Sequence, residues 1–302
     1  MSMVDAGLLL AASFFSLYAL ACALECGIGL SLLGLGGDSA RAQSLFTPFW
    51  EVTNVFLVFG FTTLGVLFNS SLQTISHALL STLAVGLISL LLRACIVLKI
   101  FYVNAGRPKR LEILLFSICN FVIPLSFTAA GAYLVTGQLF WHTLLGWLIM
   151  LAAFLGLTAI GLLSVERIKK QSLGNLAYVL WLLVLGCLLP LTIAHTNKGL
   201  QQWPIALLAL LSFAGLLALL LNFIARMRLL LLATTVIVGL SAPLLLAWAN
   251  RPYLINGQLT LANAYGAQAF GSVVIIGLIV TLPVILLGGW LFYKLIKTPL
   301  SI

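Results

Sequence analysis

Charged side chains are scarce in this chain. Only 7% of its 302 residues are Asp, Glu, Lys or Arg, and only 6 of these are acidic. A soluble domain carries about 25% charged residues, so the composition excludes one. Hydrophobic residues make up 63% of the chain, and no low-complexity tract or long polar linker divides them. The sequence therefore predicts a single polytopic membrane domain over 1–302.

Residues that usually hold metals and haems are also few. The five cysteines form no CxxC pair, so neither a disulfide framework nor a thiolate metal site is indicated. His77, His142 and His195 fall near helix ends, where an imidazole is easily solvated, and there is no HExxH motif. We expect this chain to carry no catalytic residue of its own and to bind no metal and no haem.

Long apolar runs fill most of the sequence, and about nine of them reach the roughly 20 residues that cross a bilayer. Backbone groups have no hydrogen-bond partners in lipid, so each run should be an α-helix. The predicted fold is an all-α integral membrane protein with about nine transmembrane helices. The approximate spans are 6–35, 49–68, 76–101, 111–136, 141–165, 175–194, 203–225, 228–248 and 268–295.

The basic residues indicate the orientation. If the N-terminus lies outside, Lys198 and Arg251 are the only cations in outer loops, Arg93 lies within a span, and the rest of the 15 lie in inner loops. Short cytoplasmic loops carry the excess of Lys and Arg, so we predict the N-terminus out and the C-terminus in. The net charge of +9 then reports orientation and contact with anionic lipid rather than nucleic-acid binding.

Two helix prolines suggest an internal duplication. Pro124 lies in the fourth run and Pro243 in the eighth, within FVIPLSF and LSAPLLL. Two four-helix bundles over 6–136 and 141–248, with a peripheral last helix at 268–295, would fit a parallel repeat about an axis along the membrane normal. Prolines are also frequent in ordinary membrane helices, so both interpretations stay open.

Glu25, Glu51 and Arg93 are the charged side chains set inside long apolar runs. Burying such a group costs roughly 2.5–3.5 kcal/mol on insertion scales, so it usually persists because it is paired or functional. In the predicted orientation all three lie toward the cytoplasmic side of one helical cluster. Trp50, beside Glu51, suits the membrane interface, and Asn54 lies one turn further along the same face.

Two interpretations of this cluster stand side by side. One is a structural ion pair with a spare carboxylate held protonated. The other is a proton or cation entry path with Glu25, Glu51, Arg93, Trp50 and Asn54 as its candidates, because desolvated carboxylates can exchange protons. The glycines that follow Glu25 permit close helix approach or water entry beside its carboxylate.

Five segments of the chain, taken in order, carry a family resemblance. They are ALECGIGLSLL, PFWEVTNVFLV, LLRACIVLKIF, SICNFVIPLSFTAAGAYLVTG and YLINGQLTLANAYGAQ. The first three are similar to GFDMGVG, HWDGNQVWL and FFRPVGFDYR of subunit II of cytochrome bd-type quinol oxidases. The other two are similar to that family's fourth helix and to the loop before its last helix. Glu25 and Glu51 stand where the family has aspartates, and Val52-Thr53-Asn54 replaces Gly-Asn-Gln, so the chain resembles a divergent member.

The resemblance implies the non-haem subunit of a terminal oxidase that oxidises membrane quinol and reduces oxygen to water in a respiratory chain. Its partner would be the haem-bearing subunit I, with haems b and d, in a bacterial cytoplasmic (inner) membrane. Support of subunit I assembly and cytoplasmic proton uptake would be its tasks. The resemblance leaves room for a structural quinone or lipid and for a small single-helix accessory subunit. The alternative is a stand-alone transporter or cation carrier that uses the Glu and Arg cluster.

Overall fold

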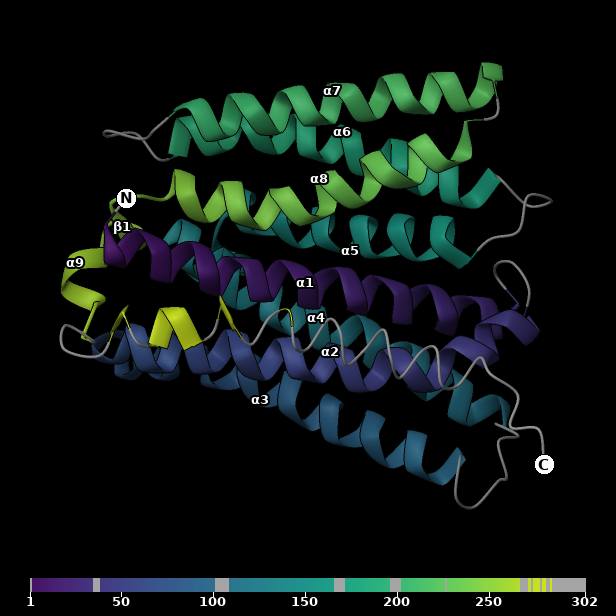
Figure 1. Cartoon of the computed structure of the whole chain (residues 1–302), viewed down its shortest axis with the longest axis horizontal. Coiled ribbons are helices and arrows are strands. Elements are labelled where there is room, and N and C mark those ends of the chain that lie inside the picture. Colours follow the sequence, from purple (N-terminus) through teal and green to yellow (C-terminus); the bar gives the residue numbers. More distant parts are fainter. Residues whose placement is uncertain are drawn as a thin grey trace.

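The computed structural model describes residues 2–34, 39–100, 109–165, 172–195, 202–225 and 227–266, with short pieces between 271 and 283. For residues 39–52, for 189–195 and at a few other helix ends, the description covers the backbone alone. Eight long helices run back and forth along one direction (Figure 1). They are α1 Met3–Leu32, α2 Ser39–Leu67, α3 Leu72–Leu98, α4 Arg110–Thr136, α5 Leu144–Val165, α6 Ser172–His195, α7 Gln202–Ala225 and α8 Arg228–Ala249.

Seven of these helices agree with the predicted apolar runs to within four residues at each end, whereas α2 begins ten residues before the predicted start at 49. In the described part of the chain, six helices are long and apolar enough to cross a membrane, and α2 and α6 contain the shorter apolar stretches Thr53–Leu67 and Gly174–Leu188. The prediction of an all-helical membrane protein is confirmed, apart from one short β-hairpin. The nine-span count and the orientation stay predictions, since most of the predicted ninth span, 268–295, lies outside the described residues.

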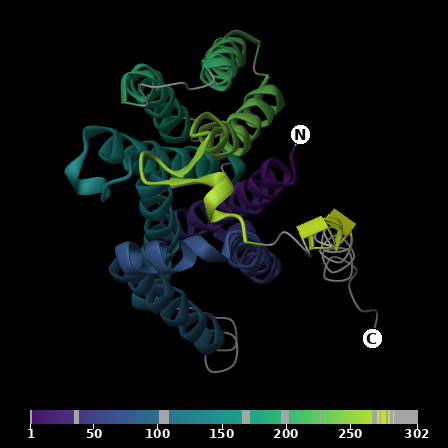
Figure 2. The same cartoon turned by 90° about the vertical axis from the view of Figure 1, so that its left-hand side faces the viewer.

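Helix α1 lies at the centre of the assembly, with α6, α7 and α8 on one side and α2 and α3 on the other (Figure 2). It packs mainly against α2, α5 and α8. Small residues allow the contact with α5, because a Cβ atom added to Gly27 would overlap the main-chain carbonyl of Gly161. Such small-residue contacts bring membrane helices into backbone contact. The position of Glu25, two residues earlier, is therefore held by tight packing.

One end of the bundle, here called the hairpin end, carries the short elements. These are η1 Asn69–Ser71, η3 Phe140–His142, the strands β1 Tyr253–Ile255 and β2 Leu259–Thr260, and the single turn α9 Leu261–Ala264. The hairpin is tied to the end of α4, where Asn256 N donates to Leu134 O at 2.9 Å and Gln258 Nε2 donates to Gly137 O at 2.6 Å. It thereby closes the space between α4 and α8.

Ion pairs mark both ends of the bundle. At the hairpin end, Arg251 Nη2 lies 2.6 Å from Asp5 Oδ1 and joins the start of α1 to the segment after α8. At the opposite end, here called the basic end, Lys99 Nζ lies 3.1 Å from Glu112 Oε1 and joins α3 to α4. The basic end is the end that the sequence predicts to be cytoplasmic.

Candidate functional site

A buried ion pair joins α1 to α3. Arg93 Nη1 donates to Glu25 Oε2, and the exposed fractions of the two residues are 0% and 3%. The second carboxylate oxygen, Oε1, accepts from Thr53 Oγ1 of α2 at 2.8 Å. Each oxygen of Glu25 therefore has a donor. A buried ion pair is tolerated when such additional hydrogen bonds satisfy it.

The guanidinium of Arg93 has two amide partners as well. Nη2 donates to Asn54 Oδ1 of α2 at 3.0 Å, and Nη1 lies 3.4 Å from Asn120 Oδ1 of α4. Its Nε finds no acceptor among the residues that the structure describes. Arg93 thus contacts α1, α2 and α4 from α3, and it is the hub of the cluster.

Three of the five predicted site residues meet in this cluster, namely Glu25, Arg93 and Asn54. The backbone of Trp50 and Glu51 belongs to α2, but their side chains lie outside the described part of the chain. The other three residues meet because they lie at similar positions along their helices. Helices α1 and α3 both run from the hairpin end to the basic end, and Glu25 and Arg93 precede the ends of their helices by similar lengths.

The sequence interpretation missed two members of the cluster, Thr53 and Asn120. Both are fully buried. Asn120 also donates from Nδ2 to the main-chain oxygen of Glu25 at 3.0 Å. Its signal was an amide in the middle of the apolar run SICNFVIP, where a polar group must find a partner. Thr53 carried a weaker signal, because threonine often bonds to its own helix.

The cluster lies inside the bundle but close to its basic end. Arg93 precedes Lys99 by six residues along α3, a rise of about 9 Å, and Lys99 is 54% exposed at the basic end. A proton or small cation would cross roughly two helix turns to reach the carboxylate of Glu25 from that end. Chemically, the cluster offers one titrating group held between a fixed cation and a hydroxyl.

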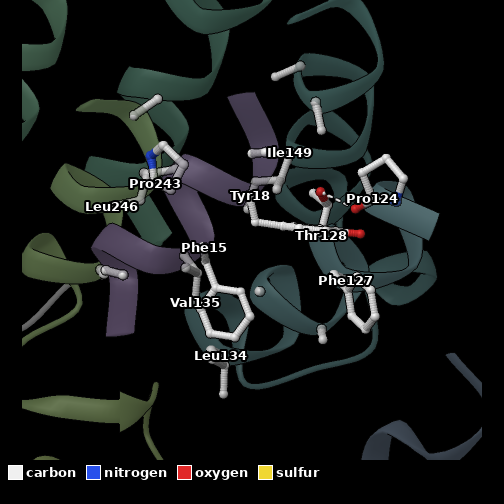
Figure 3. A pocket seen from close by; sticks show the side chains of 18 of the residues that line it. Phe15, Tyr18, Pro124, Phe127, Thr128, Leu134, Val135, Ile149, Pro243 and Leu246 are labelled. Carbon is white, nitrogen blue, oxygen red and sulfur yellow. Dashed lines mark hydrogen bonds between the residues drawn. The ribbon is translucent and has the colours of Figure 1, made fainter. Parts of the chain in front are cut away.

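A separate apolar cavity of about 340 Å³ lies toward the hairpin end, between α1, α4, α5 and α8 (Figure 3). Phe15, Phe127 and Leu246 form parts of its wall, and Thr128 Oγ1 turns away to donate to Pro124 O at 2.8 Å. One polar atom at the wall, Oδ1 of Asn250, has no hydrogen-bond partner in the described structure, whereas the hydroxyl of Tyr18 has the Cys22 thiol as its neighbour. The cavity suits a mostly apolar ligand.

The lining of this cavity contains no histidine, methionine or cysteine, the side chains that most often serve as axial ligands of haem iron. His77 is exposed on α3, and His142 is exposed and accepts from Trp141 Nε1 at 2.9 Å. The side chain of His195 lies outside the description. Within the described ranges no three metal-ligating side chains gather at one point.

The cysteines are unpaired thiols wherever the structure describes them. Cys22, Cys26 and Cys119 are buried close to the ion pair, whereas Cys95 and Cys187 are exposed. Cys26 Sγ donates to the main-chain oxygen of Asn120 at 3.1 Å. The buried thiols act mainly as small packing groups, and Cys26 adds a link between α1 and α4.

Comparison with known proteins identifies the family and the fold of this chain. The profile of the cytochrome bd terminal oxidase subunit II family matches residues 3–296. A solved structure of bd oxidase from Geobacillus thermodenitrificans contains a similar chain, with a TM-score of 0.76 and 19% sequence identity. That likeness covers 98% of this chain and 99% of the other. No curated protein sequence matches this one. On the match over nearly its whole length, the chain belongs to the cytochrome bd terminal oxidase subunit II family.

Proposed function

We propose that this subunit takes up protons from the cytoplasm through Glu51 and Glu25 and supports assembly of the haem-bearing subunit I. The complex, a quinol oxidase, oxidises membrane quinol and reduces oxygen to water in a bacterial cytoplasmic membrane. The observation that carries the proposal is the Glu25 carboxylate, which is buried near the basic end between Arg93 and Thr53. A group that costs several kcal/mol to bury marks an ion pathway more often than a packing device.

In this mechanism Glu51, which precedes Thr53 by two residues on α2 and so lies about 3 Å nearer the basic end, receives a proton and Glu25 passes it toward the partner subunit. Arg93 cannot be deprotonated in a protein, so it stays a fixed positive charge and keeps at least one carboxylate ionised. The hydroxyl of Thr53 donates to Glu25 Oε1 when the acid is ionised. The same hydroxyl can accept when the acid is protonated, so the hydrogen bond survives both states.

The partner surface in this proposal is the exposed face of α3 near the hairpin end. Gln73, His77 and Ser81 recur there at every fourth position, and all three are exposed. Every exposed described residue of α7, by contrast, is apolar between Trp203 and Ala225. Exposed polar side chains on one face of a helix can hydrogen-bond to the helices of a partner chain. Subunit I would therefore cover α3, and lipid would surround α7.

The haems of the complex belong to subunit I in this proposal. The apolar cavity would hold the chain of a structural quinone or lipid, whose head group could reach the Tyr18 hydroxyl or Asn250. Support comes from the apolar lining and from Oδ1 of Asn250, which has no hydrogen-bond partner among the described residues. Extraction of the purified complex followed by mass spectrometry would identify the occupant.

The test of proton uptake uses the complete oxidase in vesicles. Glu51→Gln and Glu25→Gln keep the side-chain shape but remove the titrating group, so turnover should fall while haem content stays normal. Asp5→Asn is the matched control, because Asp5 is a buried acid of the same helix α1 at the other end. Wild-type turnover with an unchanged pH profile in the Glu25→Gln, Glu51→Gln double variant would leave only a structural ion pair.

Two further measurements address partnership and orientation. The chain purified alone should show no haem absorption and no quinol oxidase activity, and stoichiometric haem would contradict the assignment of the haems to subunit I. Reporter fusions should place the tail after Lys294 in the cytoplasm and the residues before Gly7 outside. A C-terminal reporter that is active only on the outer side would overturn the nine-helix topology.

A further inference from the structure

Asn120 of α4 contacts both members of the buried ion pair with different atoms. Its Oδ1 accepts from Arg93 Nη1 at 3.4 Å, and its Nδ2 donates to the main-chain oxygen of Glu25 at 3.0 Å. A carboxamide is suited to this position because it offers an acceptor and two donors in one planar group. One side chain thus links α4 to the backbone of α1 and to the guanidinium on α3.

Pro124 gives the backbone of Asn120 a second link. Proline has no N–H, so the carbonyl four residues earlier loses its donor within the helix. That carbonyl belongs to Asn120, and Cys26 Sγ donates to it at 3.1 Å. A buried carbonyl without a partner is destabilising, and the thiol of α1 supplies a donor for it. The helix-breaking residue of α4 therefore provides an acceptor beside the ion pair.

Together these bonds fix the rotation of α1 relative to α4. Asn120 is bonded to Glu25 through its side chain and to Cys26 through its backbone. On the far side, the Gly27 contact with Gly161 prevents α1 from moving away. The carboxylate of Glu25 consequently leaves α1 in the direction of Arg93.

We propose that Asn120, set in place by Pro124 and Cys26, is the positioning residue that holds the Arg93 guanidinium against the Glu25 carboxylate. This role rests on the proposed proton uptake through Glu25. Without the amide, Arg93 keeps its bond to Asn54 but loses the acceptor that holds Nη1 beside Glu25. A carboxylate with a weaker cation contact holds its proton more tightly, so the pH profile of turnover moves to higher pH.

The first test is Asn120→Leu in the complete oxidase, with Asn222→Leu as the matched control. Asn222 is a buried amide of α7, outside the cluster. Asn120→Leu should lower turnover about tenfold, the equivalent of one hydrogen bond to a charged group, and shift the pH profile upward by about one unit. Asn222→Leu should keep the wild-type profile. An unshifted profile in Asn120→Leu overturns the proposal.

Milder variants cover the case in which Asn120→Leu fails to assemble. Cys26→Ala removes the thiol donor, whereas Cys26→Ser replaces it with a hydroxyl. Pro124→Ala restores a backbone donor for the Asn120 carbonyl, which then competes with Cys26. Cys26→Ala and Pro124→Ala should shift the profile upward by less than Asn120→Leu, and Cys26→Ser should restore it. The control is Pro204→Ala in α7, which does not line the apolar cavity; wild-type profiles in both test variants would refute the positioning role.

Infrared difference spectra separate this proposal from proton uptake itself. The carbonyl band of protonated Glu25 is assigned by its disappearance in Glu25→Gln. At one pH it should be stronger in Asn120→Leu, or in Cys26→Ala, than in the wild type. If Glu25→Gln keeps wild-type turnover, the proton-uptake role fails, yet a stronger band still supports positioning. An unchanged band refutes positioning whatever the turnover.

Discussion

The helices α1–α4 and the helices α5–α8 each form a group of four packed helices, but the side chains buried in the two groups differ. The first group buries an ion pair, Glu25 with Arg93, and the amide of Asn120. The second group buries only neutral polar side chains in its described part, namely Asn175, Tyr178, Ser212, Asn222 and Thr235. Both groups reach close helix contacts through small residues, since Gly215 of α7 lies against the ring of Tyr178 much as Gly29 of α1 lies against Ser117.

The difference shows that the architecture does not require buried charge. The second group forms four long helices without any ion pair among its described residues, so the pair in the first group is an additional cost that packing alone does not explain. Replacing a buried ion pair by apolar side chains is often neutral or stabilising. Its presence at the basic end is explained by the proposed role in proton uptake.

The largest expected effect comes from removing the cation. Arg93→Leu leaves the Glu25 carboxylate buried with only hydrogen bonds, which costs about 3–5 kcal/mol. We expect loss of haem-loaded complex, measured by co-purification of subunit I and by haem absorption. Arg251→Leu, which removes a partly exposed cation at the hairpin end, should keep most of the complex. If both variants lost the same amount of haem-loaded complex, the buried ion pair would contribute no more to assembly than the ion pair at the hairpin end.

The next largest effect is expected from a substitution at the contact between the first and second helix groups, where α1 packs against α5. Gly27→Val places a side chain where the backbone of Gly161 lies, and neither backbone can move away without disturbing the cluster. Overpacking of this kind costs about 3 kcal/mol, so the thermal midpoint of the complex should fall clearly. Gly186→Val in α6 is the control, because no described heavy atom lies within 4 Å of its added Cβ.

Much of this arrangement was predictable from the sequence, because hydropathy defines helices in a membrane. The eight described helices lie at the predicted runs, and the shared depth of Glu25 and Arg93 indicated their meeting. The partners of the pair were harder to foresee. Hydropathy does not say which face of α4 carries Asn120 toward α1, since that direction depends on how the helices pack. The proposed repeat over 6–136 and 141–248 stays a prediction.

The sequence analysis also did not predict the β-hairpin that follows α8. Asn256-Gly257 is a strong turn signal between two short apolar stretches, and Gly257 has φ +70. The sequence interpretation treated this segment only as a connection. Its tie to the end of α4 could not have been read from the turn signal, because the bonds to Leu134 and Gly137 depend on where α4 ends.

A smaller effect should follow from Thr53→Val, which keeps the shape of the side chain but removes the donor to Glu25 Oε1. A hydrogen bond to a charged group contributes about 1.5–3 kcal/mol, and we expect a several-fold drop in turnover with haem content unchanged. The control, Thr63→Val, lies in the same helix and is equally buried, but its hydroxyl bonds to Phe59 O of its own helix. A drop of the same size in Thr63→Val would show that any buried threonine of α2 matters.

The smallest effect is expected in the second group, from Asn222→Leu. Oδ1 of Asn222 has no hydrogen-bond partner within the described residues, so the amide already bears part of the cost of burial. Replacing an incompletely bonded polar group by an apolar one of similar volume is close to neutral. We expect the stability of the complex to change by less than about 1 kcal/mol, with turnover and pH profile as in the wild type. Thermal unfolding and oxygen consumption would measure both. A shifted pH profile would place Asn222 in the proton pathway. The inference that only the first helix group carries proton-transfer residues would then be wrong.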